Sequence, residues 1–106
     1  SMDKAQRIVE ELSIKEYPVI IEIEGSFFIT RSDLKAKDEV LVLLYKLKKV
    51  DFDFLFSNTR DKNRSRFEET LKKMLSERLI ATKDENYFLL PLGIRYVEDN
   101  GLLRFP

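Results

Sequence analysis

The sequence predicts a single domain of the α+β class, and three observations lead to that prediction. The chain has 106 residues, whereas chains divide into several cores only beyond about 250 residues. Two segments combine β-branched and aromatic residues around short turns, which is typical of β-hairpins. Four other segments place apolar residues at helical spacing. The contents of 43% hydrophobic and 36% charged residues fit an ordered globular protein.

The N-terminal extension, residues 1–37, is expected to form a helix followed by a hairpin. Three apolar residues at helical spacing predict an amphipathic helix over Asp3–Ser13. The β-branched run Val19–Glu24 and the aromatic run Phe27–Thr30 predict two paired strands, with Gly25 first in a two-residue turn. We expect that this hairpin can join the second hairpin of the chain in one sheet.

Residues 38–106 are expected to form the rest of the domain, beginning with its central buried helix. The apolar residues of Val40–Val50 cover much of the helix circumference. Ser32, Asp33 and Asp38 are each suited to cap this helix, because their side-chain oxygens can accept hydrogen bonds from free backbone N–H groups.

The segment after this helix allows two interpretations. Val50–Phe54 alternates apolar and acidic residues, which is typical of a strand. Asp51 or Asp53 is equally suited to cap a short helix that continues through Phe56. Residues 57–63 are polar and rich in turn formers, and they lack the apolar periodicity of a helix.

An amphipathic helix is predicted over Arg64–Arg78, with Asn63 or Ser65 as its cap. Its apolar face should pack against the buried helix. The residues expected in this contact are Phe67, Leu71, Met74 and Leu79 on one side and Val40, Leu44 and Leu47 on the other.

A second hairpin and a last helix complete the predicted elements. Leu79–Lys83 and Tyr87–Leu90 flank the turn residues 84–86 and predict two antiparallel strands. Leu92–Asp99 predicts a helix, which the pair Asn100-Gly101 ends.

From Asp38 to Asp99 this order of elements resembles the winged helix-turn-helix superfamily, particularly small bacterial regulators of the MarR and ArsR kinds. The pattern that carries the resemblance is Phe67-x3-Leu71-x2-Met74-x4-Leu79-Ile80, followed by Tyr87-x-Leu89-x-Pro91-x-Gly93-x2-Tyr96-Val97-Glu98. The resemblance implies a recognition helix over Arg64–Arg78 and a wing formed by the second hairpin. The expected fold is therefore a winged helix-turn-helix with an N-terminal helix and β-hairpin extension.

The resemblance also implies a nucleic-acid interface, and basic residues gather where it would lie. Six basic side chains occur within fourteen residues against three acidic ones, so positive charge is in excess there. A solvated loop and helix start that only keep the protein soluble explain this charge equally well. The candidate site residues are Arg60, Lys62, Arg64, Ser65, Arg66, Glu69, Lys72 and Lys73.

Three features weaken the expectation that the chain reads the sequence of duplex DNA. The first is that residues 57–63, just before the expected recognition helix, lack the apolar periodicity of a second helix. Glu69 occupies the centre of the exposed helix face, although the pairs Glu68–Lys72 and Glu69–Lys73 have the spacing of helical ion pairs. A solvated face is therefore the preferred interpretation of Glu69 over contact with a cytosine amino group. The expected wing tip, residues 83–86, is short and net acidic.

Several phenylalanines have no assigned place in the predicted core. Exposed rings would let single-stranded bases stack beside the basic residues, but phenylalanines at strand spacing more often belong to the core. The rings in question are those of Phe27, Phe28, Phe52, Phe54, Phe56 and Phe105.

The composition argues against an enzyme and against a bound cofactor. The chain has no Cys and no His, which excludes cysteine nucleophiles and the commonest metal ligand and general base. The acid pairs Glu22-x-Glu24 and Asp51-x-Asp53 could hold Mg²⁺, but alternation along a half-exposed strand explains them better. We therefore expect neither a metal site nor a cofactor.

The expected partner is single- or double-stranded DNA, with a protein partner or a homodimer as the alternative. The apolar tail residues Leu102, Leu103 and Phe105 favour that alternative, because they should be buried against the first hairpin or across a dimer interface. No segment is apolar enough to span a membrane, so the expected location is the cytoplasm.

Overall fold

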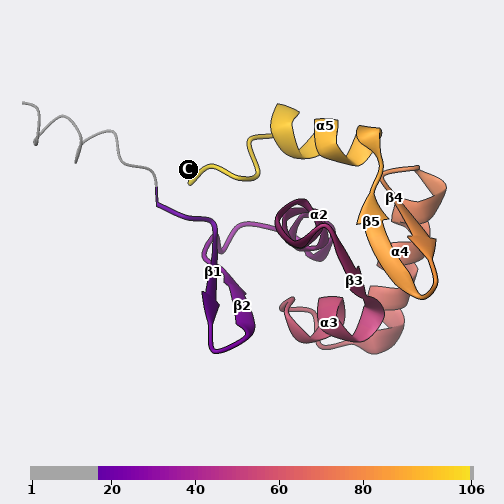
Figure 1. The fold of residues 1–106 in the computed structure, drawn as a ribbon, viewed down its shortest axis with the longest axis horizontal. Helices are drawn as coiled ribbons and strands as arrows, with labels where there is room; N and C mark the ends of the chain where they lie inside the picture. The colour runs from indigo at the N-terminus through magenta and orange to yellow at the C-terminus, as the bar shows by residue number, and fades with distance from the viewer. Residues whose placement is uncertain (1–16, 106) are drawn as a thin grey trace, which may run out of the picture.

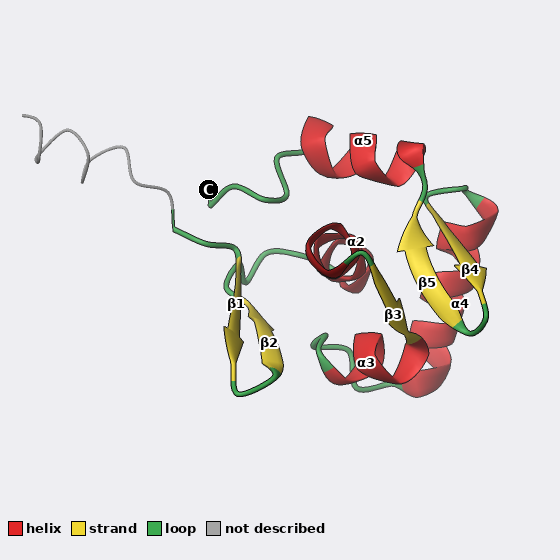
Figure 2. Ribbon diagram, in the orientation of Figure 1, coloured by secondary structure: helices red, strands yellow, loops and turns green. Residues whose placement is uncertain are grey.

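The computed structural model describes residues 17–105, which contain four helices and five strands and belong to the predicted α+β class (Figures 1 and 2). The helix expected over Asp3–Ser13 lies outside the described residues. In chain order the elements are β1 (Ile20–Ile23), β2 (Ser26–Ile29), α2 (Ala36–Leu47), β3 (Lys49–Asp51), α3 (Phe52–Ser57), α4 (Arg64–Ser76), β4 (Ile80–Lys83), β5 (Asn86–Leu89) and α5 (Pro91–Asp99).

The two hairpins lie in separate sheets, so the expectation that they join is wrong (Figure 1). β1 pairs with β2 alone, whereas the second sheet has the strand order β3-β5-β4. β3 pairs with β5 on the side opposite β4, beginning with the pair Lys49↔Phe88. The first hairpin contacts α3 instead, because the Phe27 backbone N–H donates to the side-chain oxygen of Asn58 at 2.9 Å.

Both hairpin turns contain two residues with positive φ, the geometry that suits the twist of paired strands. In the first turn these residues are Glu24 at 50° and Gly25 at 84°, so Gly25 is second and Ser26 already belongs to β2. The expected turn is therefore wrong by one residue. In the second turn they are Asp84 at 52° and Glu85 at 67°, one residue fewer than expected.

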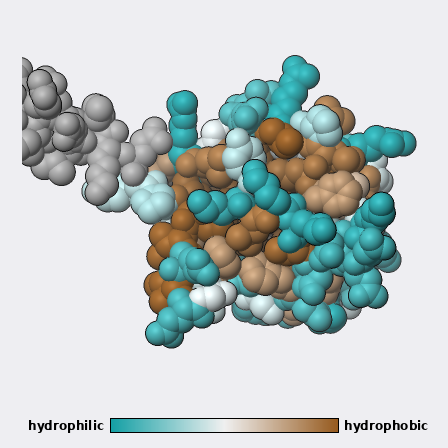
Figure 3. Space-filling model, in the orientation of Figure 1, coloured by the Kyte–Doolittle hydropathy of each residue, from teal (hydrophilic) through white to brown (hydrophobic). Residues whose placement is uncertain are grey.

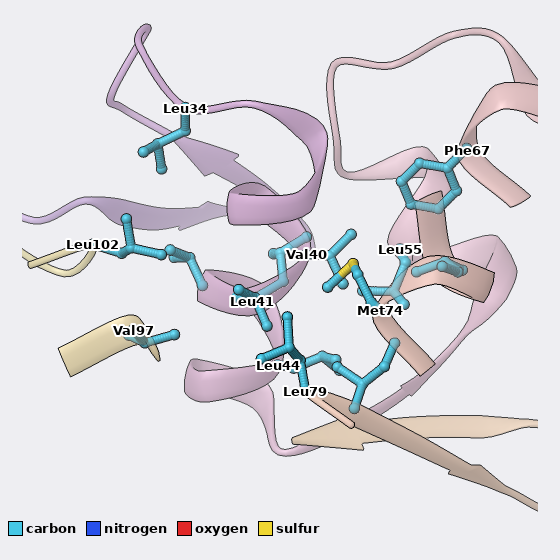
Figure 4. Packing of buried hydrophobic residues seen from close by; sticks show 14 of the residues in the cluster. Leu34, Val40, Leu41, Leu44, Leu55, Phe67, Met74, Leu79, Val97 and Leu102 are labelled. Atoms are coloured by element: carbon cyan, nitrogen blue, oxygen red, sulfur yellow. The ribbon is translucent and has the colours of Figure 1, made fainter. Parts of the chain in front are cut away.

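α2 is the central buried helix, as predicted. Its residues Val40–Leu44 are at most 1% exposed. In Figure 4, Val97 and Leu102 approach α2 from one side and the α3 and α4 residues from the other. The predicted contact is confirmed: the buried cluster includes Val40, Leu44, Phe67, Leu71, Met74 and Leu79, and the half-buried Leu47 packs against it.

α2 begins without a side-chain cap, so the expected caps are wrong. Lys35 stands at the N-cap position and makes no capping hydrogen bond. Asp33 is engaged elsewhere, because it pairs with Arg31 at 2.8 Å. Asp38 lies inside the first turn of the helix, and Ser32 precedes the cap position by three residues.

The ambiguous segment combines both predicted conformations. β3 ends at Asp51, and the side chain of this residue then caps α3 by accepting the Phe54 N–H at 2.9 Å. The next cap matches one of the two predicted residues, because Asn63 accepts the Arg66 N–H at the start of α4 at 2.9 Å.

The C-terminal tail folds back on the described chain, and the expectation of full burial holds only in part. Leu102 is buried and Leu103 is half-buried. Arg31 holds this segment by donating to two backbone carbonyls of the tail, both at 3.0 Å. Phe105 lies beyond the second of these bonds and is 43% exposed, so it is not buried against its own chain, and its burial across a dimer interface stays a prediction.

Candidate nucleic-acid interface

Arg60 lies in the turn before α4 and holds that turn to α2. Its backbone N–H and its Nε both face the carboxylate of Glu39, at 3.1 and 3.3 Å. The same guanidinium donates to the backbone carbonyls of Ser32 and Leu34, each at 2.9 Å. Because Glu39 is only 2% exposed, the charge of Arg60 offsets a buried carboxylate.

Arg66 is engaged by Asp61 in a two-pronged ion pair. The two nitrogen–oxygen distances are 2.6 and 3.0 Å, and the Asp61 side chain is 7% exposed. The hydrogen bonds from Arg66 and from the Asn63 backbone N–H lower the pKa of Asp61 to about 2. The pair therefore stays ionised at neutral pH, and the charge of Arg66 is neutralised locally.

Arg64 is held on the other side of the α4 N-terminus. Its Nη2 lies 3.2 Å from Asp53, and its Nε lies 3.8 Å from Glu68. The guanidinium also lies over the Phe52 ring, 4.6 Å from the centroid. Two carboxylates and an aromatic ring thus surround this one cation.

The exposed face of α4 carries Glu69 and Lys72, which pair with each other at 3.4 Å. The expected pairs Glu68–Lys72 and Glu69–Lys73 are therefore wrong, since Glu68 faces Arg64 one turn earlier in the helix. The Glu69 side chain is 73% exposed, so it lies on a solvated face.

The remaining predicted site residues are Lys62, Ser65 and Lys73, all exposed. Lys62 donates to the backbone carbonyl of Thr59 at 3.3 Å. Within residues 17–105, neither Lys62 nor Lys73 has a carboxylate oxygen within 4.0 Å. These two lysines keep their charge available to a ligand.

The phenylalanines proposed for base stacking mostly belong to the core. The rings of Phe52, Phe56 and Phe67 form a cluster with centroid separations of 5.4 to 6.0 Å. Phe27 packs against Phe54 at 5.7 Å. The two that are exposed are Phe105 and Phe28 of the first hairpin, over which apolar surface is visible in Figure 3.

A basic groove of about 560 Å³ separates the start of α2 from α4, and we call it the α2–α4 groove. Five basic and three acidic side chains line it. Two of them, Lys35 and Lys37, are absent from the predicted site, because only the fold brings this distant segment beside α4. The charged residues of the groove are Lys35, Lys37, Glu39, Arg60, Asp61, Arg66, Lys73 and Glu77.

A second groove of about 460 Å³ lies between α4 and the β4–β5 hairpin, and we call it the α4–hairpin groove. Its floor is apolar, with Phe52, Leu71, Leu75 and Tyr87. Four carboxylates and only two basic side chains surround this floor, so the local charge is negative. The charged residues are Asp51, Asp53, Arg64, Glu68, Lys72 and Glu85.

The helical repeat explains how α4 borders both grooves with different residues, whereas the opposite charge of the grooves comes from the elements that face α4. At about 100° per residue, positions 64, 68, 71, 72 and 75 of α4 cluster on one side, and they line the α4–hairpin groove. Positions 66, 70, 73, 74 and 77 cluster on the opposite side, and they line the α2–α4 groove. Glu69 lies on the ridge between the two.

Of the two acid pairs considered for Mg²⁺, one has other contacts and the other is exposed to solvent. Asp51 caps α3 and Asp53 pairs with Arg64, while Glu22 and Glu24 are exposed. In the part of the chain that the structure describes, no three His, Cys, Asp or Glu residues gather to hold a metal ion. None of the helices described there is long and apolar enough to cross a membrane.

Comparison with protein-family models, with curated protein sequences and with solved structures finds no significant match to this chain. The function is therefore argued from the geometry of its own residues.

Proposed function

We propose that this chain is a winged-helix protein that binds nucleic acid through phosphate contacts in the α2–α4 groove. The order of elements supports the winged-helix assignment, because α2, α3 and α4 precede a β-hairpin as the sequence resemblance implies. The short strand β3 extends the β4–β5 hairpin into a three-stranded sheet beside α4.

The observation that carries the proposal is the excess of basic side chains in the α2–α4 groove. Glu39 and Asp61 are already neutralised by Arg60 and Arg66. Lys37 lies 3.9 Å from Glu77, a distance that leaves this partly exposed pair weak. The charge that remains for phosphates comes chiefly from Lys35 and Lys73 in the groove, with Lys62 in the turn before α4 adding to it.

A surface with three or four free lysines supports binding without sequence readout. Phosphate contacts position a protein on nucleic acid but carry no sequence information. We expect dissociation constants of about 10⁻⁴ to 10⁻⁶ M at physiological salt, as for other non-specific binding. In this account Arg60 and Arg66 shape the groove, while the lysines supply the attraction.

The test is a fluorescence-anisotropy titration of the full chain with single- and double-stranded oligonucleotides at two salt concentrations. Replacing Lys35 and Lys73 by Gln should weaken binding to all sequences alike and flatten the log-log salt slope by about one to two units. Replacing Lys46 and Lys49 by Gln removes the same charge outside both grooves, so affinity should change far less. Undetectable binding at low salt, or equal losses in both variants, would contradict the proposal.

A further inference from the structure

The α4–hairpin groove has the opposite chemistry to the α2–α4 groove, although both border the same helix. Its carboxylates come from three elements: Asp51 and Asp53 from the start of α3, Glu68 from α4, and Glu85 from the hairpin turn. A phosphate backbone approaching this side of α4 would meet like charge. The nucleic-acid proposal therefore leaves this groove without a role.

The floor of the groove offers apolar area beneath the charged rim. Leu71 is 2% exposed and belongs to the core, whereas Phe52, Leu75 and Tyr87 are half-buried and open to the groove. A binding surface of this kind favours a ligand with both an apolar side chain and a charged one.

The contacts of Arg64 show that the groove can hold a guanidinium group. Its guanidinium lies over Phe52 and between Asp53 and Glu68, at the distances given above. One arginine of the chain thus occupies one end of the groove. A guanidinium over an aromatic ring and beside carboxylates gains both cation–π and charge-assisted attraction.

Two carboxylates of the groove remain without a cation. Within residues 17–105, Asp51 and Glu85 form no ion pair, although Asp51 accepts a backbone N–H at the start of α3. Lys72 points its charge toward Glu69 on the ridge, 3.4 Å away. The groove therefore keeps a net negative charge that an incoming cation would neutralise.

We propose that the α4–hairpin groove binds a basic segment of a partner protein, an arginine- or lysine-bearing stretch that also carries apolar side chains. Charge complementarity identifies this occupant: the rim selects cations, and the floor receives an apolar residue. The segment would lie beside Arg64 and reach Asp51 and Glu85. This proposal does not depend on the nucleic-acid function, which uses the other side of α4.

The experiment measures binding of the full chain to an acetylated and amidated octapeptide that alternates arginine and leucine. Two comparison peptides replace arginine by glutamate or leucine by serine. We expect the arginine-leucine peptide to bind most tightly, since it alone matches both the rim and the floor. No detectable binding, or equal binding of the glutamate-leucine peptide, would overturn the proposal.

Matched variants locate the binding. Replacing Glu68 and Glu85 by Gln should weaken peptide binding about fivefold, the loss expected for two exposed ion pairs. Replacing Glu22 and Glu24 by Gln makes the same charge change on the first hairpin and should leave affinity within about twofold. Equal weakening in both variants would indicate attraction to net charge alone and would overturn the proposal.

A variant that should bind the peptide more tightly provides a further control, because loss of the fold cannot raise the affinity. Replacing Arg64 by Ala frees Asp53, Glu68 and the Phe52 ring for the peptide, so affinity should rise by about twofold to fivefold. Unchanged or weaker binding in this variant would contradict the proposed position of the peptide.

Discussion

The α2–α4 groove and the α4–hairpin groove differ in charge because of the elements that face α4: the start of α2 brings two lysines to the first groove, whereas the start of α3 and the hairpin turn bring three carboxylates to the second. Arg64 and Arg66 are two positions apart in the sequence, yet about 200° of rotation separates them on α4. Arg64 joins a rim of four carboxylates, and Arg66 joins a lining of five basic residues. A run of basic residues along a helix is therefore not one basic surface.

The grooves also differ in what their arginines do. Arg60 and Arg66 in the α2–α4 groove satisfy carboxylates that are 3% and 7% exposed at the side chain, so they stabilise the fold. Arg64 in the α4–hairpin groove pairs with carboxylates whose side chains are 79% and 51% exposed, and such pairs add little stability. The free charge of the basic groove thus comes from lysines, and the free charge of the acidic groove from carboxylates.

The largest expected effect is a loss of stability when a buried residue of α4 is truncated. Leu71→Ala removes a buried side chain that also forms part of the acidic groove's floor, and it should lower the free energy of unfolding by about 2 to 5 kcal/mol. Urea denaturation measures this loss. Leu92→Ala makes the same truncation at a residue that is 52% exposed and should cost within about 0.5 kcal/mol. Similar losses in both variants would contradict the burial of Leu71.

A smaller loss of stability is expected when Arg60 is replaced, because this residue, unlike the lysines of the α2–α4 groove, neutralises a buried carboxylate. Arg60→Ala leaves the buried Glu39 without its cation and should cost about 1 to 3 kcal/mol, because a buried charged acceptor loses hydrogen bonds. Arg95→Ala removes an exposed pair with Asp99 and serves as the control in thermal unfolding. If Arg60→Ala melted like the wild type and yet lost oligonucleotide binding, Arg60 would be a phosphate contact instead.

Single arginine substitutions should affect oligonucleotide binding unequally. Arg66→Ala leaves Asp61 uncompensated in the basic groove and should weaken binding about threefold or more, whereas Arg64→Ala should change it by less than about twofold. Glu69→Gln removes a carboxylate from the ridge and should tighten binding by up to about twofold. Anisotropy titrations at low salt measure all three. Equal losses for Arg64→Ala and Arg66→Ala would mean that nucleic acid contacts both sides of α4.

The smallest effect concerns acid pH. The pKa of Asp61 is lowered to about 2 in the fold, from an ordinary value of 3.8, so this carboxylate stabilises the fold at pH values above about 4. That contribution is lost as the pH falls toward 2, because the folded protein resists protonation that the unfolded chain accepts. The difference in unfolding free energy between the wild type and Asp61→Asn should therefore shrink between pH 4 and pH 2. A difference that stays constant over this range would contradict the Arg66–Asp61 pair.

The spacing of hydrophobic residues is the sequence pattern that predicted the fold best. Local spacing of apolar residues and turn formers predicts the strands of both hairpins, the buried helix α2, the apolar face of α4 and the end of α5 at Asp99. The turn at Glu24-Gly25 was placed one residue too late because both possible positions put a glycine where φ is positive.

Features that depend on distant contacts were not predictable from local pattern. Asp33 is a good helix cap by type, but Arg31 engages it. The first hairpin packs against the α3 region through Phe27, a contact between distant segments, and does not join the second sheet. Lys35 and Lys37 join the site only through the packing of α2 against α4, and Asp53 meets Arg64 from eleven positions earlier in the chain, across the rest of α3 and the turn that follows it.

The most direct test of two grooves with opposite ligands is amide chemical-shift mapping on the full chain. A twelve-nucleotide single-stranded oligonucleotide and the arginine-leucine octapeptide would be titrated separately. We predict that the oligonucleotide shifts the amides around Lys35, Lys37 and Lys73, and that the peptide shifts those around Asp53 and Glu85. Overlapping shifts from both ligands, or oligonucleotide shifts centred on the β4–β5 hairpin, would contradict two separate grooves of opposite charge beside α4.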